Sequence, residues 1–127
     1  MRILLTEDDD SVRAFVARAL ELDGHSVDTA CDGIEAIERL EAADGQFDLL
    51  VSDVKMPMMD GIALAHEAAF RWPDLPILLM TGFADQRERA DDLSHVIRDV
   101  LTQPFTLQQS REAVMDAAEE AARVRAA

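Results

Sequence analysis

The sequence is poor in cysteine and in positive charge, and each shortage excludes a class of protein. Its 127 residues include one cysteine, Cys31, so no disulfide can form within the chain. No motif surrounds Cys31, which favours a buried structural thiol over a reactive one. With 26 acidic and 12 basic residues, the net charge of −14 argues against a surface that binds nucleic acid.

Long hydrophobic runs are missing as well. No apolar stretch approaches the roughly 20 residues of a membrane-spanning helix, so we expect no membrane contact. The first apolar run is short and leads directly into acidic residues, a pattern that no signal peptide has. We therefore expect a cytoplasmic protein. A length of 127 residues and a 49% hydrophobic composition fit a single globular domain over residues 1–127.

Short apolar runs alternate with helical patterns along the chain. The runs predict strands at 2–6, 25–30, 47–52, 76–80 and 95–101. Asp10 or Ser11 can cap a first helix, whose apolar face consists of Val12, Phe15, Val16, Ala19 and Leu20. Further helices are expected near 34–43, at 61–71, at 83–93 and from 106 or 107. Strict alternation predicts an α/β fold, a doubly wound five-stranded parallel sheet in the order 2-1-3-4-5, with no effector domain.

Polar residues follow the strand runs at the points where these runs end. Glu7 and Asp8 follow the first run, Asp53 the third, Thr81 the fourth and Gln103 the fifth. In the expected strand order these residues meet at one edge of the sheet, where open α/β folds bind ligands. Crowded carboxylates repel one another, so either their pKa values rise or a cation lies among them. Ligation by carboxylate oxygens selects Mg²⁺ or Mn²⁺.

Asp53 is the candidate nucleophile because it is a lone acid on a central strand. A carboxylate that attacks a phosphoryl donor forms an aspartyl phosphate, and a metal with nearby donors neutralises the transferring oxygens. Thr81 offers a hydroxyl group there, and the backbone carbonyl of Lys55 is a candidate metal ligand. Asp9 and Asp10 need no such role, because acidic residues suit the N-terminus of any helix.

Taken in order, these motifs resemble the receiver domain of two-component response regulators over the whole chain. The matching pieces are Ile3 to Asp9 with Arg13, Asp53 to Pro57 with Asp60-Gly61, Met80-Thr81-Gly82, and Gln103-Pro104-Phe105. One piece alone is weak support, whereas the full set at this spacing is specific. The resemblance implies a phosphoprotein in which a phosphohistidine donor phosphorylates Asp53. It also implies Mg²⁺ held by Asp53, Asp8, a water on Glu7 and the Lys55 carbonyl.

The resemblance also implies partners. Upstream it implies a histidine kinase or a histidine phosphotransferase, and downstream a protein target that contacts the fourth helix, fifth strand and fifth helix. The Glu-Asp-Asp start, the Thr-Gly-Phe after the fourth strand and the stand-alone length resemble CpdR-type single-domain regulators, which implies a protease adaptor role. Such a module serves phosphorelay signal transduction by protein contact, so we expect it not to be an enzyme.

Two residues depart from the receiver pattern. Receivers have lysine before the proline that follows the fifth strand, where this chain has Gln103, and an aromatic residue where it has Val100. Glutamine offers neutral hydrogen bonds in place of a charge. We therefore expect Mg²⁺ to bind at least as well as in lysine-bearing receivers, while phosphorylation drives a weaker conformational change.

Two other functions fit the same residues. One is a pseudo-receiver that binds partners independently of phosphorylation, which Gln103 favours. The other is a Mg²⁺-dependent phosphohydrolase with an aspartyl-phosphate intermediate. Such enzymes with an Asp-x-Asp motif have a second acid two residues after the nucleophile, where this chain has Lys55. An acyl phosphate that depends on Asp53 would exclude the first alternative, and turnover of small phosphomonoesters would support the second.

Overall fold

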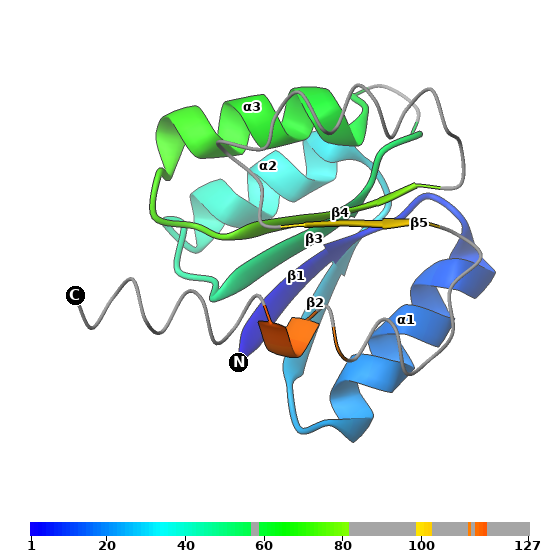
Figure 1. Ribbon diagram of the computed structural model, residues 1–127. Coiled ribbons are helices and arrows are strands. Elements are labelled where there is room, and N and C mark those ends of the chain that lie inside the picture. Colours follow the sequence, from blue (N-terminus) through cyan, green and yellow to red (C-terminus); the bar gives the residue numbers. More distant parts are fainter. Residues whose placement is uncertain (57–58, 82–98, 103–111, 113, 117–127) are drawn as a thin grey trace.

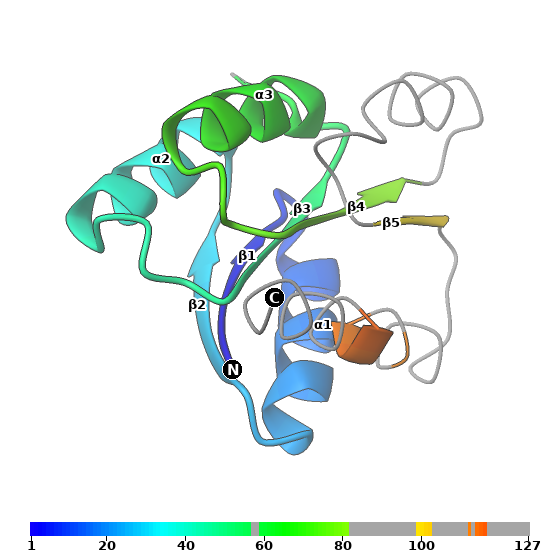
Figure 2. The same cartoon turned by 60° about the vertical axis from the view of Figure 1, so that its left-hand side comes forward.

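The structure is a computed structural model that describes residues 1–56, 59–81, 99–102, 112 and 114–116. Its elements, in chain order, are β1 (Arg2–Thr6), α1 (Asp10–Leu22), β2 (Ser26–Ala30), α2 (Gly33–Ala42), β3 (Leu49–Asp53), α3 (Gly61–Arg71), β4 (Ile77–Thr81) and β5 (Asp99–Thr102). Figures 1 and 2 show α2 and α3 over one face of the sheet and α1 over the other. Residues 112 and 114–116 are helical and lie on the α1 side.

The described strands form one parallel sheet in the order β2-β1-β3-β4-β5, which confirms the predicted topology. At the carboxyl end of β1, Thr6 is opposite Ala30 of β2 and Ser52 of β3. The last residue of β3, Asp53, is opposite Met80 of β4. This register brings the ends of β1, β3 and β4 to one edge, so the residue that follows Thr6 emerges next to Asp53.

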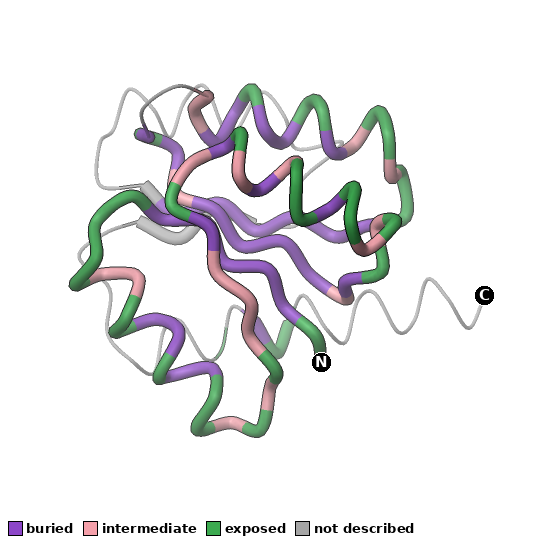
Figure 3. The backbone as a smooth tube through the Cα atoms, turned by 180° about the vertical axis from the view of Figure 1, so that it is seen from behind, coloured by how far each residue is buried: buried purple, intermediate pink, exposed green. Residues whose placement is uncertain are grey.

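The central strands are mostly apolar because helices cover both of their faces. Successive side chains point to opposite faces, so each strand contributes to two cores. The core beneath α1 includes Ile3, Leu5, Leu49, Val51, Leu78 and Val114. The core beneath α2 and α3 includes Leu4, Leu50, Ile77 and Leu79. Figure 3 shows the buried residues concentrated on the central strands, while the edge strand β2 is only half-buried.

The helices α1, α2 and α3 begin in the same way. Each starts after an aspartate whose side chain accepts a hydrogen bond from the backbone N–H three residues later, which satisfies one otherwise unpaired donor. These N-caps are Asp9, Asp32 and Asp60, with distances of 3.0, 2.8 and 2.8 Å. Because Asp9 and Asp60 end the loops that follow β1 and β3, the two caps also fix how those loops leave the sheet.

Three expectations about local structure need correction. The α1 helix is capped by Asp9 and begins at Asp10, so its cap lies one residue before Asp10 and two residues before Ser11, the two predicted caps. Phe15 is 49% exposed, so it lies off the apolar face of α1 to which it was assigned. Cys31 is exposed rather than buried, because it follows the edge strand β2. Its thiol donates to Glu35 at 3.1 Å, and that hydrogen bond raises the pKa of the thiol, which disfavours the reactive thiolate.

Other predicted elements fall partly or wholly outside the described residues. They include the helix at 83–93, the first part of the strand at 95–101 and the start of the last helix at 106 or 107. Among the helical residues that can be described, no helix has both the length and the apolar composition needed to cross a bilayer.

Candidate functional site

Carboxylates from two strands meet at the carboxyl edge of the sheet. Glu7 and Asp8 follow β1, and Asp53 ends β3. One oxygen from each of these residues lies within 4.8 Å of the others. Glu7 is buried, Asp53 is half-buried and Asp8 is exposed, so the group opens to solvent on the Asp8 side. The structure thus brings together the three acidic residues that the sequence assigned to a metal site.

Burial makes the negative charge of this cluster costly. The Glu7 residue is 2% exposed, and its Oε2 has no hydrogen-bond partner within the described part of the chain. Its Oε1 accepts the backbone N–H of Asp9 at 3.1 Å. Burial raises the pKa of Glu7 to about 8, with smaller contributions from the Asp53 and Asp8 charges. Burial likewise raises the pKa of Asp53 to about 6, and the charge of Asp8 adds to that shift.

These residues fit a hard divalent cation. An unpaired oxygen on buried Glu7, beside two further carboxylates, is a group that a cation would satisfy while restoring the ionised forms. All the side-chain ligands are carboxylate oxygens, the ligands that Mg²⁺ prefers over softer metals. Within the described ranges, no other group of three His, Cys, Asp or Glu side chains is close enough to hold a metal.

The backbone around Asp53 is held from several directions. The N–H of Val54 donates to the carbonyl of Met80 at 2.9 Å, which extends the β3–β4 pairing past the acid. The N–H of Gly61 donates to the carbonyl of Val54 at 2.8 Å. A Cβ on Gly61 would overlap the carbonyl oxygen of Asp53, so only glycine lets α3 begin this close. Buried Ser52 donates its hydroxyl to the same oxygen at 2.9 Å. This support fixes the backbone from which the carboxylate of Asp53 projects.

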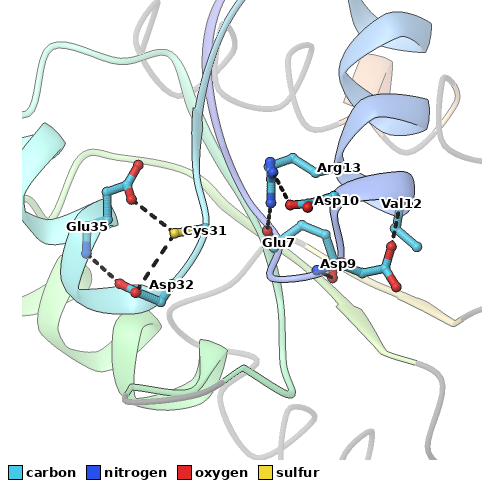
Figure 4. Close-up of polar contacts among 8 residues, drawn as sticks. All are labelled: Glu7, Asp9, Asp10, Val12, Arg13, Cys31, Asp32 and Glu35. Atoms are coloured by element: carbon cyan, nitrogen blue, oxygen red, sulfur yellow. Dashed lines mark hydrogen bonds and ion pairs between the residues drawn. The ribbon is translucent and has the colours of Figure 1, made fainter.

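The loop after β1 is held by a side chain to which the sequence gave no role. The N–H of Glu7 donates to the carbonyl of Ala30 at 3.1 Å, and Arg13 Nη1 donates to the carbonyl of Glu7 at 2.9 Å. Figure 4 shows Arg13 reaching from α1 toward both Glu7 and Asp10. Arg13 belongs to the motif described above, but its target is a backbone atom. Because every residue has a backbone carbonyl, the sequence alone does not mark this target.

The remaining predicted site residues are placed only in part. The side chain of Lys55 is exposed, and its backbone carbonyl as a metal ligand stays a prediction. Thr81 is the last residue of β4, and its backbone is opposite Thr102 of β5. Gln103, the residue after Thr102, lies outside the described residues. The strand order therefore brings the backbone of Thr81 to the same edge as Asp53, as the sequence predicted.

A cavity of about 450 Å³ lies at the opposite, amino-terminal edge of the sheet, between the loops that precede β3 and β4. The guanidinium of Arg71 at its rim stacks on Trp72 at 4.6 Å from the ring centre and pairs with Glu41 at 2.7 Å. Because these groups already satisfy one another and lie far along the strands from Asp53, we assign the cavity no part in the chemistry.

Comparisons with known proteins agree with this geometry. The model of the family described as response regulator receiver domain matches residues 3–115. The response regulator receiver protein CpdR of Brucella abortus is 43% identical over 106 residues, which make up 84% of this chain and 87% of CpdR. The response regulator MprA of Mycobacterium avium is 38% identical over 109 residues, 86% of this chain but 47% of MprA. The chain thus spans about half the length of MprA and most of the length of CpdR.

A solved structure resembles the fold in the same way. The response regulator protein TrrA of Thermotoga maritima, in complex with Mg²⁺-BeF, superposes with a TM-score of 0.81 at 28% identity. The match covers 91% of this chain and 97% of TrrA. It therefore extends over nearly the whole of both chains.

Proposed function

Because the chain belongs to the response regulator receiver domain family of two-component signalling, we propose that it is a stand-alone regulator switched by Mg²⁺-dependent phosphorylation of Asp53. The observation that carries this proposal is the convergence of Glu7, Asp8 and Asp53 at the carboxyl edge of the sheet. The match to CpdR, which covers 84% of this chain and 87% of CpdR, supports the proposal that residues 1–127 form a receiver domain. As the resemblance to CpdR-type regulators implies, we expect the protein to pass on its signal by contact with another protein.

The proposed metal shell uses residues that the fold brings to one edge. Mg²⁺ would be held by the carboxylates of Asp8 and Asp53, by a water on Glu7 and by the backbone carbonyl of Lys55. When bound, the ion supplies positive charge that neutralises the transferring phosphoryl oxygens. Support comes from the unpaired Glu7 oxygen and from TrrA, whose structure was solved in complex with Mg²⁺-BeF.

The proposed reaction is a single displacement at phosphorus. A carboxylate oxygen of Asp53 attacks the phosphorus of a phosphohistidine on a histidine kinase or histidine phosphotransferase. The P–N bond breaks, its electron pair returns to the imidazole nitrogen, and an aspartyl phosphate remains. The hydroxyl of Thr81 and the side-chain amide of Gln103 are the proposed hydrogen-bond donors to the phosphoryl oxygens. The chemistry changes the protein itself, so the chain acts as a signalling module and not as an enzyme on other substrates.

The proposed output surface is the face of the fourth helix, fifth strand and fifth helix, most of which lies outside the described residues. A protein target is favoured over nucleic acid because the net charge of −14 would repel a phosphate backbone. Binding of a basic or neutral protein surface is compatible with that charge.

A pseudo-receiver is the second candidate, and one observation favours it. Gln103 stands where receivers have lysine, so the usual charge on the phosphoryl group is absent from that position. In this case the protein would bind partners through the same face without ever forming an acyl phosphate.

Phosphotransfer to the purified protein separates the two candidates. The protein is incubated with Mg²⁺ and either acetyl phosphate or a phosphorylated histidine phosphotransferase, and its intact mass is then measured. We expect one phosphoryl group on the wild type and none on Asp53→Ala. Asp74→Ala, which removes an exposed acid between α3 and β4, is the matched control and should be labelled like the wild type. A folded wild type that takes no phosphoryl group from either donor would refute phosphorylation and favour the pseudo-receiver.

A further inference from the structure

The two carboxylates that follow β1 depend on the course of a short loop. Glu7 and Asp8 lie between the last residue of β1, Thr6, and the cap of α1, Asp9. At this point the ladder of strand hydrogen bonds ends, so the backbone carbonyl of Glu7 needs another partner. The N–H of Glu7 still donates to the carbonyl of Ala30 in β2 at 3.1 Å. The carbonyl of Glu7 is therefore the group whose partner decides how the loop turns.

That partner is the side chain of Arg13. Its Nη1 donates to the carbonyl of Glu7 at 2.9 Å, while its Nη2 pairs with Asp10 (Figure 4). The Arg13 side chain is 22% exposed, and it comes from the first turn of α1. Because the guanidinium is planar, its two donors have a fixed relative direction. Arg13 thus links the end of β1 to the start of α1 across the acidic loop.

The bonded carbonyl belongs to the peptide group that joins Glu7 to Asp8. A peptide group is planar, so fixing the direction of its oxygen fixes the rotation about the Cα–C bond of Glu7 and the position of the Asp8 Cα that follows. The side chain of Asp8 starts from that Cα. The same course of the loop places the N–H of Asp9, which donates to the Glu7 carboxylate at 3.1 Å. One hydrogen bond from Arg13 therefore constrains two of the three side chains that meet at the cluster.

We propose that Arg13 is a positioning residue for the metal site: its guanidinium holds the peptide plane between Glu7 and Asp8 and so directs both carboxylates toward Asp53. The inference rests on the proposed function, since it assigns Arg13 a part in binding the same Mg²⁺. Arg13 touches neither the ion nor the phosphoryl group in this proposal, and it acts only through the loop.

Whether removal of Arg13 weakens or strengthens Mg²⁺ binding separates a positioning role from a simple effect of its charge. Arg13 is a cation close to an acidic cluster, so removing its charge should strengthen the binding of another cation if charge alone matters. Positioning predicts the opposite result. Without the guanidinium, the loop that carries Glu7 and Asp8 is free to move. Binding of Mg²⁺ must then order this loop, and the entropy cost of ordering lowers the affinity for Mg²⁺.

The test measures Mg²⁺ dissociation constants by titration calorimetry. Arg13→Ala should bind Mg²⁺ about 10- to 100-fold more weakly than the wild type, the range found when a group that orients metal ligands is removed. Arg13→Lys should lie between the two, because lysine keeps the charge but lacks the second fixed donor. Arg18→Ala is the matched control, since it removes an exposed arginine from the same helix, and its affinity should not fall.

Thermal unfolding without Mg²⁺ checks that each variant is folded. If Arg13→Ala does not fold, the test uses Arg13→Lys instead. A Mg²⁺ affinity of Arg13→Lys equal to that of the wild type would then overturn the inference. Arg13 variants that unfold at lower temperature yet bind Mg²⁺ as well as, or better than, the wild type would show a merely structural role and also overturn it. A wild type that binds no Mg²⁺ would overturn the proposed function and this inference with it.

Discussion

Gly61, the first residue of α3, lies directly against the backbone carbonyl of Asp53, with no room for a Cβ between them. The N–H of Gly61 also donates to the carbonyl of Val54, the residue after Asp53, at 2.8 Å. Because the neighbouring atoms are backbone atoms of Asp53 and Val54, they cannot move aside as a flexible side chain would. The position of Asp53 is therefore coupled to the residue at which α3 begins.

Gly61→Ala should lower both stability and Mg²⁺ affinity. Overpacking typically costs about 1–3 kcal/mol, which exceeds the gain of up to about 1 kcal/mol that alanine brings to a helix. The measurement is urea unfolding followed by the fluorescence of Trp72, the one tryptophan, together with Mg²⁺ titration. Gly24→Ala is the control: Gly24 has φ +89° and open space around it. That variant should lose about 1–2 kcal/mol and keep its Mg²⁺ affinity. Equal affinities in both variants would argue against the coupling.

The N-caps offer a second comparison. Asp9→Ala and Asp32→Ala each remove one cap hydrogen bond, of 3.0 and 2.8 Å, and each should cost about 1 kcal/mol of unfolding free energy. Only Asp9 ends the loop that carries Glu7 and Asp8, so only Asp9→Ala should also weaken Mg²⁺ binding. Asp9→Ser, which can still cap the helix, should recover the stability. If Asp32→Ala weakened Mg²⁺ binding as much as Asp9→Ala, the effect would be general destabilisation.

Removal of the metal should make stability depend on pH near neutrality. Burial raises the pKa of Glu7 from 4.5 to about 8 and that of Asp53 from 3.8 to about 6. The folded protein then holds these protons more tightly than the unfolded chain does. This stabilisation is fully present below the ordinary pKa values of the two carboxyl groups, and it is lost as the pH rises through about 8. In EDTA, the free energy of unfolding should therefore fall between about pH 6.5 and 8.5, a range in which ordinary carboxylates are already ionised.

Two controls identify the source of that slope. Glu7→Gln cannot lose a proton, so it should be more stable than the wild type at pH 8.5 in EDTA and should show a much smaller slope. Saturating Mg²⁺ should flatten the wild-type curve, because the ion stabilises the ionised carboxylates. An equal slope in Glu7→Gln would assign the pH dependence to other groups.

Much of the fold could be predicted because the sequence marks the ends of strands and helices with acidic, glycine and proline residues. The bounds of β1 and α3 agree with the predicted 2–6 and 61–71, since an acidic run ends the first and Asp60-Gly61 and Trp72-Pro73 frame the second. The cluster followed from topology alone: parallel strands that adjoin must end at one edge. Glu7 and Asp53 therefore met although 46 positions separate their numbers in the chain.

Some local details could not be predicted from the sequence, because several residues could fill the same structural role. Four consecutive acids, Glu7 to Asp10, supply several possible caps, and only the loop geometry selects Asp9. Phe15 lies one position, or about 100° of helix rotation, from buried Val16, which is enough to expose it. The bond from Arg13 ends on a backbone carbonyl, which every residue has, so no sequence pattern marks that target.

Gln103→Lys should weaken Mg²⁺ binding and strengthen the response to phosphorylation. A unit charge pair at about 4 Å is on the order of 4 kcal/mol at an effective dielectric of 20, so a lysine would compete with the metal and attract the phosphoryl group. The measurements are Mg²⁺ titration and the change in amide hydrogen exchange on phosphorylation. Gln103→Met, of similar size but uncharged, is the control. Tighter Mg²⁺ binding in Gln103→Lys would contradict this expectation.

The most direct test of the central claim is to locate the phosphoryl group and vary the ligand from the other strand. Acetyl phosphate is added in Mg²⁺ or in EDTA, the acyl phosphate is trapped by borohydride reduction, and the modified peptide is sequenced by mass spectrometry. We predict modification of Asp53 in Mg²⁺ alone, and a higher Mg²⁺ requirement in Asp8→Asn. Equal modification in EDTA, an unchanged Mg²⁺ requirement in Asp8→Asn, or a label on another residue would contradict a metal-assisted acceptor built from β1 and β3.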